Sequence, residues 1–408
     1  MFQLLLAIIY LAFISLGLPD ALLGSAWPSM HVEFGVPLSY AGIITAIICL
    51  GTIVSSLQSD RLTLKLGTGK VTAISVAMTA AALFGFSITH SFYLLCLWAI
   101  PYGLGAGSVD ASLNNYVALH YESRHMSWLH CMWGVGAATG PYIMGYALTG
   151  GLGWNSGYRI ISILQIILTI ILFLSLPLWK MRSGNVNSAV RKENDVEEKG
   201  CDLKVEQVNQ EDYHPLSLLE VLRIRGAKEI LICFFCYCAL EQTAGLWASS
   251  YLNLYKGVSA ETAASFASMF YIGITVGRAI SGFLTIKLSD TKMIRLGQGI
   301  IFAGILILLL PAGANISLLG LIMIGLGCAP VYPCIIHSTP AHFGEDKSQA
   351  VIGVQMAFAY LGSLGMPPLF GIIANSINIA LYPAYLFIIL ILMFVMHEAL
   401  IRLSVKKI

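Results

Sequence analysis

The stretch TLKLGTGK, residues 63–70, occurs again 222 residues later as TIKLSDTK, residues 285–292. Single matches of this length arise by chance, but an ordered series of them indicates a duplicated unit. Other matches follow at nearly the same spacing: Asp20 and Glu241, Trp27 and Trp247, Gly51 and Gly273, GLG at 103–105 and at 325–327, and Gly136, Pro141 and Gly145 with Gly362, Pro367 and Gly371. The sequence therefore predicts two similar halves that run in parallel.

The composition excludes an ordinary soluble domain. Of the 408 residues, 57% are hydrophobic and only 11% are charged, and the mean hydropathy is +0.79, whereas a soluble domain carries about 25% charged residues. The net charge of +2 gives no reason to expect a nucleic-acid or acidic partner. A membrane-spanning helix needs about 20 mostly apolar residues. This criterion predicts twelve spans, near residues 2–27, 38–59, 69–89, 92–117, 127–150, 158–179, 228–254, 261–286, 293–312, 316–340, 348–374 and 380–401.

The basic residues predict the orientation of these spans. With the N-terminus inside, 20 of the 23 Lys and Arg residues fall in inner loops or the C-terminal tail, and only Arg159 and Lys256 fall in outer loops. Cytoplasmic loops carry such an excess. The apolar N-terminus lacks a basic region and a small-residue cleavage site, so it is expected to remain as the first span. The sequence therefore predicts an all-α polytopic membrane protein with both termini in the cytoplasm.

A polar segment separates the two halves. Residues 181–227 contain too few apolar residues to form a core. They are expected to form a cytoplasmic linker between an N-terminal six-helix bundle, 1–180, and a C-terminal six-helix bundle, 228–408. Within the linker, PLSLLEVLRIRG, residues 215–226, is expected to form a short amphipathic helix along the inner membrane surface.

The loop after the second span, SDRLTLKLGTGK at residues 59–70, resembles the cytoplasmic signature of the major facilitator superfamily. It departs from that signature in having Ser59 in place of the opening glycine and Lys65 in place of Gly-Arg. The resemblance implies the major facilitator fold, with two pseudo-symmetric bundles and a substrate site between them. Asp60 and Arg61 are then candidates for a conformational gate, in which Asp60 pairs with a base across the seam between the halves. The alternative is an ordinary basic loop beside a helix-end charge.

Four ionisable residues fall within predicted spans: Asp20, Asp110, Glu241 and Arg278. A charge near the bilayer centre costs about 2.5–3.5 kcal/mol or more, so each should face a cavity or a partner. A low-dielectric environment favours the neutral carboxyl form. Asp20 or Asp110 is therefore a candidate for coupling proton loading to a conformational change. The alternative is a buried acid that is held by a neighbouring helix.

Two stretches resemble the fucose–proton symporter group of the superfamily: GLPDALLGSAWP at 17–28 and GSVDASLNNYV at 107–117. The resemblance implies that Asp20 couples transport to protons. It also implies that Asp110, with Asn114 four residues later, contacts sugar hydroxyls and links them to the proton step. The group has Glu where this chain has Asp110, and the chain has His130 and Trp133 near the place where glutamines bind sugar.

Further residues complete the predicted substrate site. Glu241 and Gln242 offer acceptors and an amide for hydroxyl groups, while aromatic rings stack on the C–H faces of a sugar. Arg278 is expected at the inner side of the seam as a gate residue, with direct contact to the ligand as the alternative. For Glu241 the alternative is pairing with a nearby cation. For the tryptophans the alternative is packing or interface anchoring. The other predicted site residues are Trp27, Asn115, His130, Trp133, Trp247 and Tyr332.

Together these features predict secondary active transport: proton-coupled uptake of a small polar solute, with a sugar or related polyol expected, by alternating access. The alternative is proton-driven efflux of amphipathic compounds or drugs. An enzyme is not expected, because the sequence has no nucleophile–base pairing, HExxH motif or phosphate loop. The proton is the expected coupling ion, with no metal or other cofactor. The expected partners are the solute and the lipid bilayer, and the chain is expected to be a monomer in a cell (inner) membrane.

Eight of the nine cysteines fall within apolar runs and are expected to be small buried hydrophobes, not a disulfide set. They are Cys49, Cys96, Cys131, Cys233, Cys236, Cys238, Cys328 and Cys334. Cys233 and Cys236 form a CxxC, but a metal or redox role is disfavoured because no second pair accompanies it.

Overall fold

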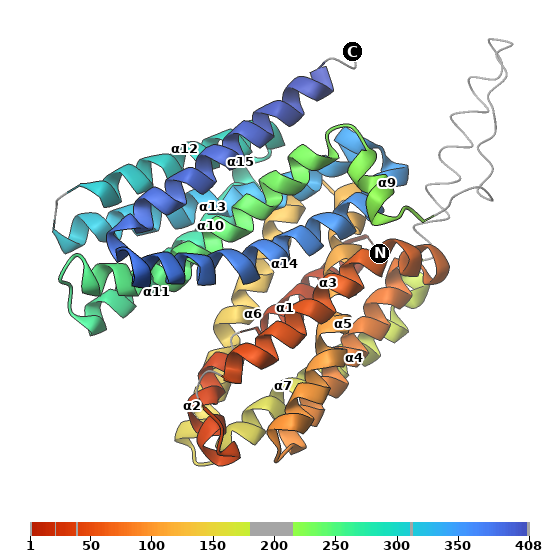
Figure 1. Cartoon of the computed structure of the whole chain (residues 1–408). Coiled ribbons are helices and arrows are strands. Elements are labelled where there is room, and N and C mark those ends of the chain that lie inside the picture. The colour runs from red at the N-terminus through yellow and green to blue at the C-terminus, as the bar shows by residue number, and fades with distance from the viewer. Residues whose placement is uncertain (1, 21, 38–39, 180–214, 311–312, 406–408) are drawn as a thin grey trace, which may run out of the picture.

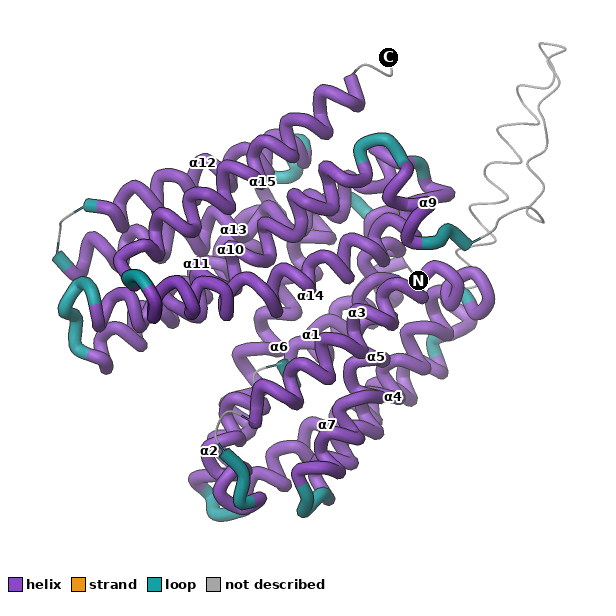
Figure 2. Tube along the Cα trace, viewed as in Figure 1, coloured by secondary structure: helices purple, strands orange, loops and turns teal. Residues whose placement is uncertain are grey.

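The computed structural model describes residues 2–405 except 21, 38–39, 180–214 and 311–312. Every regular element within these ranges is a helix (Figure 2). Ten helical segments are long and apolar enough to cross a membrane. The prediction of an all-α polytopic membrane protein is confirmed.

The first half is a bundle of helices (red to yellow in Figure 1). The break between its first two helices lies at Pro19 and Asp20, inside the first predicted span. The helices are α1 (Phe2–Gly17), α2 (Leu22–Phe34), α3 (Ala41–Leu66), α4 (Thr68–Ile88), α5 (Phe92–His120), α6 (Ser123–Thr149) and α7 (Gly153–Leu174).

The second half is a similar bundle (green to blue in Figure 1). It is preceded by a short helix, α9 (Leu218–Arg223), whose first turn is closed by a reciprocal capping box between Ser217 and Glu220. This helix falls within residues 215–226, where the sequence predicts one. The bundle consists of α10 (Ala227–Leu254), α11 (Ala260–Leu284), α12 (Asp290–Leu309), α13 (Ala314–Phe343), α14 (Glu345–Ser376), the 3₁₀ turn η3 (Ile379–Leu381) and α15 (Tyr382–Val405).

Each of the twelve predicted spans has a helix at its position, although α6 and α11 are absent from the ten most apolar ones. The reason is visible in α6, whose first half reads SRHMSWLHCMWG. These polar and aromatic residues face the other bundle, as the contacts of His130 and Trp133 described below show. A helix that lines a seam between bundles does not need to be apolar all round.

The two bundles meet at one side of the molecule. We call this the linker side, because α7 ends there and α10 begins there; the opposite end is the far side. The ribbons diverge from the linker side towards the far side (Figure 1). The main contacts between the halves join α3 and α5 to α14, α5 to α13, and α6 to α11 and α13.

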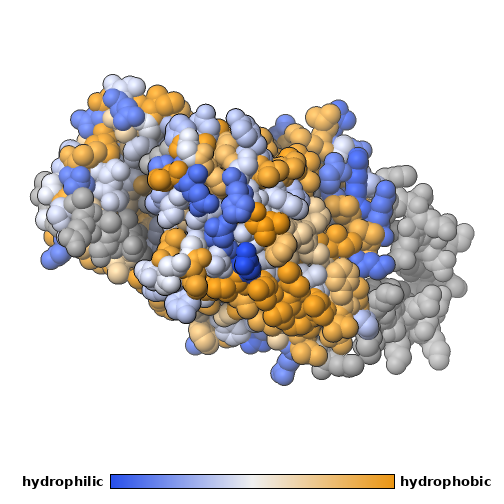
Figure 3. Space-filling model, turned by 90° about the horizontal axis from the view of Figure 1, so that it is seen from below, coloured by the Kyte–Doolittle hydropathy of each residue, from blue (hydrophilic) through white to orange (hydrophobic). Residues whose placement is uncertain are grey.

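The outer surface is largely apolar. Broad hydrophobic areas cover the face shown in Figure 3, and hydrophilic residues gather near its centre and at the end beside the grey segment. Large apolar side chains such as Tyr93, Leu174 and Ile388 are more than half exposed. Such a surface is expected of helices that contact lipid chains.

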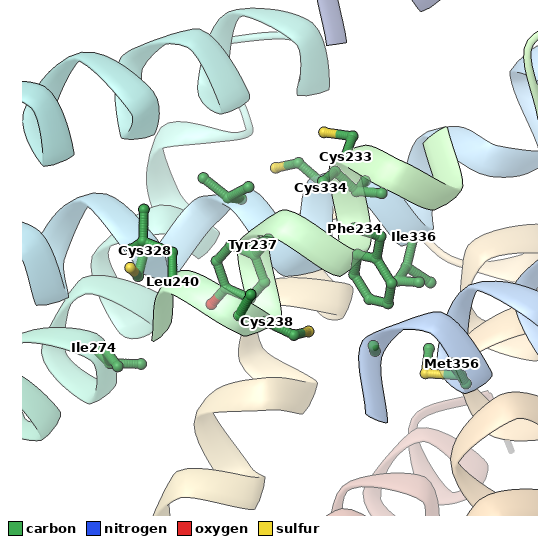
Figure 4. Packing of buried hydrophobic residues seen from close by; sticks show 14 of the residues in the cluster. Cys233, Phe234, Tyr237, Cys238, Leu240, Ile274, Cys328, Cys334, Ile336 and Met356 are labelled. Atoms are coloured by element: carbon green, nitrogen blue, oxygen red, sulfur yellow. The ribbon is translucent and has the colours of Figure 1, made fainter. Parts of the chain in front are cut away.

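The interior of the second bundle contains most of the cysteines. Cys233 and Cys238 on α10 and Cys328 and Cys334 on α13 lie among aliphatic and aromatic side chains (Figure 4). Cys131 and Cys236 are buried as well, whereas Cys49 and Cys96 are only half-buried. The described cysteines are all free. For the six buried ones the expected packing role is confirmed.

Glycines bring α1 and α6 into direct backbone contact. A Cβ atom on Gly136 would lie 2.0 Å from the carbonyl oxygen of Ile14, and one on Gly140 would lie 2.0 Å from that of Leu18. On the α1 side, a Cβ on Gly17 would lie 2.1 Å from the carbonyl oxygen of Trp133. Because each clash would be with backbone, no side-chain rearrangement can relieve it. This contact places Trp133 beside the break between α1 and α2.

Gly136→Ala should therefore destabilise the protein. Overpacking of this kind typically costs about 1–3 kcal/mol, and we expect a lower midpoint of thermal unfolding for the purified protein in detergent. Gly145→Ala is the matched control, because it lies on the same helix and a Cβ there meets nothing within 4 Å. Equal midpoints for the two variants would show that the α1–α6 contact is looser than described.

Candidate functional site

Asp20 lies at the break in the first span and faces α6. The chain turns there, with the Asp20 N–H donating to the carbonyl of Gly17 (3.1 Å) and that of Leu22 to Pro19 (3.1 Å). Trp133 Nε1 donates to Asp20 Oδ2 at 2.8 Å. The Asp20 side chain is otherwise exposed. An aspartate outside the regular helix thus keeps one oxygen on a fixed indole donor while the group remains accessible.

Asp110 lies near the middle of α5 and is joined to His130 on α6 through Asn114. Asn114 Nδ2 donates to Asp110 Oδ1 at 2.8 Å, and Asn114 Oδ1 lies 3.0 Å from His130 Nε2. Because the amide oxygen only accepts, His130 must donate from Nε2. Asp110 is half-buried, whereas Asn114 and His130 are buried. The sequence spacing of four residues thus produces a fixed acid–amide–imidazole series.

The second half closes over this series with two tyrosines. Tyr360 on α14 donates to Asp110 Oδ2 at 3.4 Å. The ring of Tyr332 on α13 lies edge-on to that of His130, with centroids 4.6 Å apart, and its hydroxyl contacts Met356 Sδ at 3.2 Å. Asp110 therefore has partners in both halves, which is the arrangement needed for a group that responds to their relative movement.

Arg278 and Glu241 bring a second pair of charges to the same seam. Arg278 Nη2 lies 3.8 Å from Glu241 Oε1, and the guanidinium lies over the ring of Trp133, 5.4 Å from its centroid. Both side chains are buried, at 3% and 8% exposure. Arg278 Nε and the hydroxyl of nearby Tyr237 have no hydrogen-bond partner among the described residues. These groups offer a donor and a hydroxyl that a polar ligand can use.

Trp133 and His130 lie three residues apart on α6 and connect the two groups of residues. Trp133 contacts Asp20 on one edge and Arg278 over its ring, while His130 contacts Asn114 and Tyr332. We call the residues Asp20, Asp110, Asn114, His130, Trp133, Glu241, Arg278, Tyr332 and Tyr360 the central cluster. It contains carboxylates, an amide, an imidazole, a guanidinium and aromatic faces, the groups that recognise a hydroxylated ligand.

On the linker side of the central cluster, hydrogen bonds join the halves directly. Ser348 Oγ at the start of α14 donates to Asn115 Oδ1 at 2.7 Å, and Gln349 Nε2 donates to Ser59 Oγ at 3.2 Å. α14 approaches α3 closely, because a Cβ on Gly353 would lie 2.5 Å from the carbonyl oxygen of Ser56. The seam is closed at this end.

A second contact lies between α6, α12 and α13. Ser123 Oγ donates to Asp290 Oδ1 at 2.5 Å, and His337 Nδ1 lies 2.6 Å from Asp290 Oδ2. His337 Nε2 lies 3.2 Å from the carbonyl oxygen of Tyr121 in the other half. Since both ring nitrogens face acceptors, His337 satisfies both contacts only as the imidazolium.

Most hydrogen bonds between the halves within the described ranges lie on the linker side of the central cluster. Two lie at the level of the cluster, from Tyr360 to Asp110 and from Cys131 to the carbonyl oxygen of Thr275. Beyond the cluster, the described residues towards the far side form hydrogen bonds only within their own half. The cluster is therefore shielded from the linker side, while its member Asp20 is exposed.

The predicted gate residues differ in part from expectation. Asp60 is buried, but its partner is the backbone N–H of Leu216, which donates to Oδ2 at 3.2 Å, and not a base. Arg61 is exposed. The physical reason is that the segment before α9 lies against the end of α3, so Asp60 links α3 to the segment that leads into the second half. Arg278 lies in the central cluster, next to Glu241 and Trp133, rather than at the inner side of the seam.

Four predicted substrate residues are not brought to the central cluster. Trp27 is 3% exposed in the core of the first bundle, near Phe92. Trp247 Nε1 donates to the carbonyl oxygen of Pro367 at 2.9 Å and packs against α14. Asn115 lies in the linker-side seam, as described above. Gln242 is exposed and has no described hydrogen bond.

Sequence reasoning missed Tyr360, His337 and Asp290. Tyr360 lies in the apolar stretch QMAFAYLGSLG, and nothing there separates it from a packing residue. Asp290 is the acid in TIKLSDTK, but an acid at the start of a helix is common, so the sequence provided no reason to assign it a function. His337 follows Tyr332 by five residues, so the two lie on different faces of α13.

Comparison with known proteins identifies the family. The model of the Major Facilitator Superfamily matches residues 9–367, and a second match covers residues 230–407. The chain belongs to the major facilitator superfamily. Members of this family are transporters, not enzymes, and the chain is a multi-pass integral membrane protein.

Individual relatives are distant. Bypass of stop codon protein 6 of Saccharomyces cerevisiae is 23% identical over 392 residues, which cover 91% of this chain and 77% of the yeast protein. The crystal structure of FucP in the outward conformation aligns with a TM-score of 0.75 and 16% identity over 96% of this chain and 97% of that one; FucP is the E. coli fucose:proton symporter. The human organic anion transporter MFSD10 aligns with a TM-score of 0.72 and 13% identity over 96% and 98%. At these identities the likeness to the two solved structures shows the fold alone.

Proposed function

We propose that this facilitator carries out proton-coupled uptake of a small polar solute, a sugar or related polyol, by alternating access. The observation that carries the proposal is the position of the two aspartates. Asp20 and Asp110 both lie in the seam between the halves and each has a polar partner; Asp20 is exposed and Asp110 is half-buried. An intramembrane acid in such a position is a candidate proton carrier.

The linker side is proposed to be the cytoplasmic side, in agreement with the predicted excess of basic residues there. The conformation described is then outward-facing. Movement of the two bundles would break the contacts of Asn115 with Ser348 and of His337 with Tyr121, and would expose the central cluster to the cytoplasm. The likeness to FucP, described in the outward conformation, supports this assignment.

Each half is proposed to contribute one wall of the solute site. Asp110, Asn114 and His130 offer acceptors and donors to a rim of hydroxyl groups, while Trp133 offers a planar face. Glu241, Arg278 and Tyr360 approach from the second half. We propose a monomer in a cell membrane, with the proton as coupling ion and no metal or other cofactor.

A second candidate is proton-driven efflux of an amphipathic compound. It is favoured by the aromatic side chains that pack against Tyr332 of the central cluster. The ring centroid of Tyr332 lies 4.7 Å from that of Phe234 and 5.8 Å from that of Tyr237. Efflux would use the same acids but would take an apolar ligand.

Uptake by proteoliposomes decides between the two. A panel of labelled sugars, polyols and amphipathic cations is offered with and without an inward proton gradient. We expect gradient-driven accumulation of at least one hydroxylated solute and none of the amphipathic compounds. Gradient-driven expulsion of an amphipathic compound, with no sugar uptake, would contradict symport.

A further inference from the structure

A groove runs along the outer surface of the second bundle, away from the seam. Its linker-side part encloses 580 Å³ and is lined by Glu229 of α10 and by one face of α15 that includes Arg402. Its deeper part encloses 310 Å³ between α12 and α15. Phe394 lines both parts, so they adjoin each other at its side chain.

The charges in the groove are of two kinds. Arg295 Nε and Nη2 donate to the two carboxylate oxygens of Glu398 at 2.6 and 2.8 Å, so this pair neutralises itself. Glu229 and Arg402, by contrast, form no hydrogen bond or ion pair within the described residues, and both lie at the end of the groove near the linker side. The mouth of the groove therefore presents one negatively charged hydrogen-bond acceptor, Glu229, and one positively charged hydrogen-bond donor, Arg402.

The deeper part combines an apolar surface with one buried amide. Phe302, Ile391 and Phe394 are each more than 40% exposed and line it. Gln298 also lines it and is only 3% exposed, yet neither its amide nitrogen nor its amide oxygen has a hydrogen-bond partner among the described residues. An unpaired amide in an apolar groove is costly, so it marks a place where a ligand with a polar atom is stabilised.

The length of the groove matches one leaflet. Its lining on α15 includes Phe387 at one end and Arg402 near the other, and these two residues are about 22 Å apart along the helix at 1.5 Å per residue. One leaflet with its headgroup region is about 20–22 Å thick. A lipid whose headgroup lies at Arg402 would therefore have its acyl chain beside Phe387.

We propose that this groove is a binding site for one phospholipid with a zwitterionic primary-amine headgroup, phosphatidylethanolamine. Arg402 binds the phosphate, Glu229 accepts hydrogen bonds from the ammonium, and an acyl chain passes over Phe394 into the deeper part. The Gln298 amide hydrogen-bonds to an ester carbonyl. A choline headgroup has no N–H with which to donate to Glu229, and the headgroup of phosphatidylglycerol donates only from uncharged hydroxyl groups, which bind a carboxylate more weakly than an ammonium does.

The test uses the full-length protein in detergent and native mass spectrometry with equal concentrations of phosphatidylethanolamine, phosphatidylcholine and phosphatidylglycerol. We expect one tightly held phosphatidylethanolamine, with a Kd about tenfold lower than for phosphatidylcholine, as the loss of a charge-assisted hydrogen bond implies. Equal retention of the three lipids, or a preference for phosphatidylglycerol, would overturn the proposal without any variant.

Substitutions then test which side chain binds which part of the lipid headgroup. Glu229→Gln should remove the preference for phosphatidylethanolamine over phosphatidylcholine, and Arg402→Gln should weaken both about tenfold. Arg225→Gln and Glu345→Gln are matched controls, since both residues are exposed on the linker side and lie outside the groove. An unchanged preference in a monodisperse Glu229→Gln protein would place the lipid elsewhere. Neither result depends on which solute is transported.

Discussion

Asp20→Asn will abolish proton-driven accumulation of the solute and leave solute exchange intact. Asparagine resembles the protonated aspartate in shape, and its amide oxygen can still accept from Trp133 Nε1. The variant should therefore keep the geometry of the neutral state but never release a proton. With one proton per solute, an inward gradient of one pH unit supports about tenfold accumulation, and we expect this ratio to fall to about one.

The chain provides a matched control for this change. Glu33 Oε2 accepts a hydrogen bond from Trp154 Nε1 at 2.6 Å, so it has the same pairing of carboxylate and indole as Asp20. Trp154, however, packs in the core of the first bundle, whereas Trp133 also contacts Arg278 of the second half. Glu33→Gln should accumulate solute as the unmodified protein does. Full accumulation by Asp20→Asn would assign the coupling role to another group, and loss of exchange would mean that Asp20 is needed for binding or movement.

Asp110→Ala will weaken solute binding. Asp110 receives hydrogen bonds from Asn114 and Tyr360, so it contacts both halves within the central cluster. Losing it removes one charge-assisted acceptor and leaves the Asn114 amide free to rotate away from His130. We expect binding to weaken about 100-fold, or ~2.7 kcal/mol, since a hydrogen bond to a charged group contributes about 1.5–3 kcal/mol.

Ser112→Ala is the control on the same helix. Ser112 is buried and contacts Thr63 at 3.0 Å on the side of α5 that faces α3. Binding is measured by calorimetry with the solute found in the uptake panel. Ser112→Ala should keep its affinity, and an Asp110→Ala protein with unchanged affinity would move the solute site away from α5.

The fold was predictable because its signals repeat along the chain. Each predicted span needed only a count of apolar residues, and the ordered matches between the halves, such as Asp20 with Glu241, required no knowledge of contacts. α6 shows the limit of hydropathy, since its polar face is too hydrophilic for an apolar-window test although the helix spans the same layer. Basic residues in the loops, counted together, compensated for this weakness.

The site was predictable only where chemistry and local spacing coincide. Asp110 and Asn114 are four residues apart on one helix, so their contact follows from helical geometry. The contact between Asp20 and Trp133 depends on the glycines that bring α1 against α6, and Trp27 and Trp133 cannot be told apart by residue type alone. Partners from the other half, such as Tyr360 and His337, depend on how two bundles meet, which no local pattern contains.

The linker-side contacts explain why the conformation described can persist. Ser348 with Asn115, Gln349 with Ser59, and the contacts of Asp290 with Ser123 and of His337 with Tyr121 all join the halves at that end. Each is a polar contact that water can replace when the bundles separate. Polar contacts of this type stabilise a closed seam by modest amounts each, so the seam can open within a transport cycle.

The most direct measurement is the pH of a lightly buffered medium when solute is added to a suspension of proteoliposomes. If Asp20 carries a proton with each solute, the medium will become more alkaline as the solute enters, and Asp20→Asn will show solute entry down its gradient without this change. Verified solute uptake by the unmodified protein at constant external pH would contradict the proposed coupling.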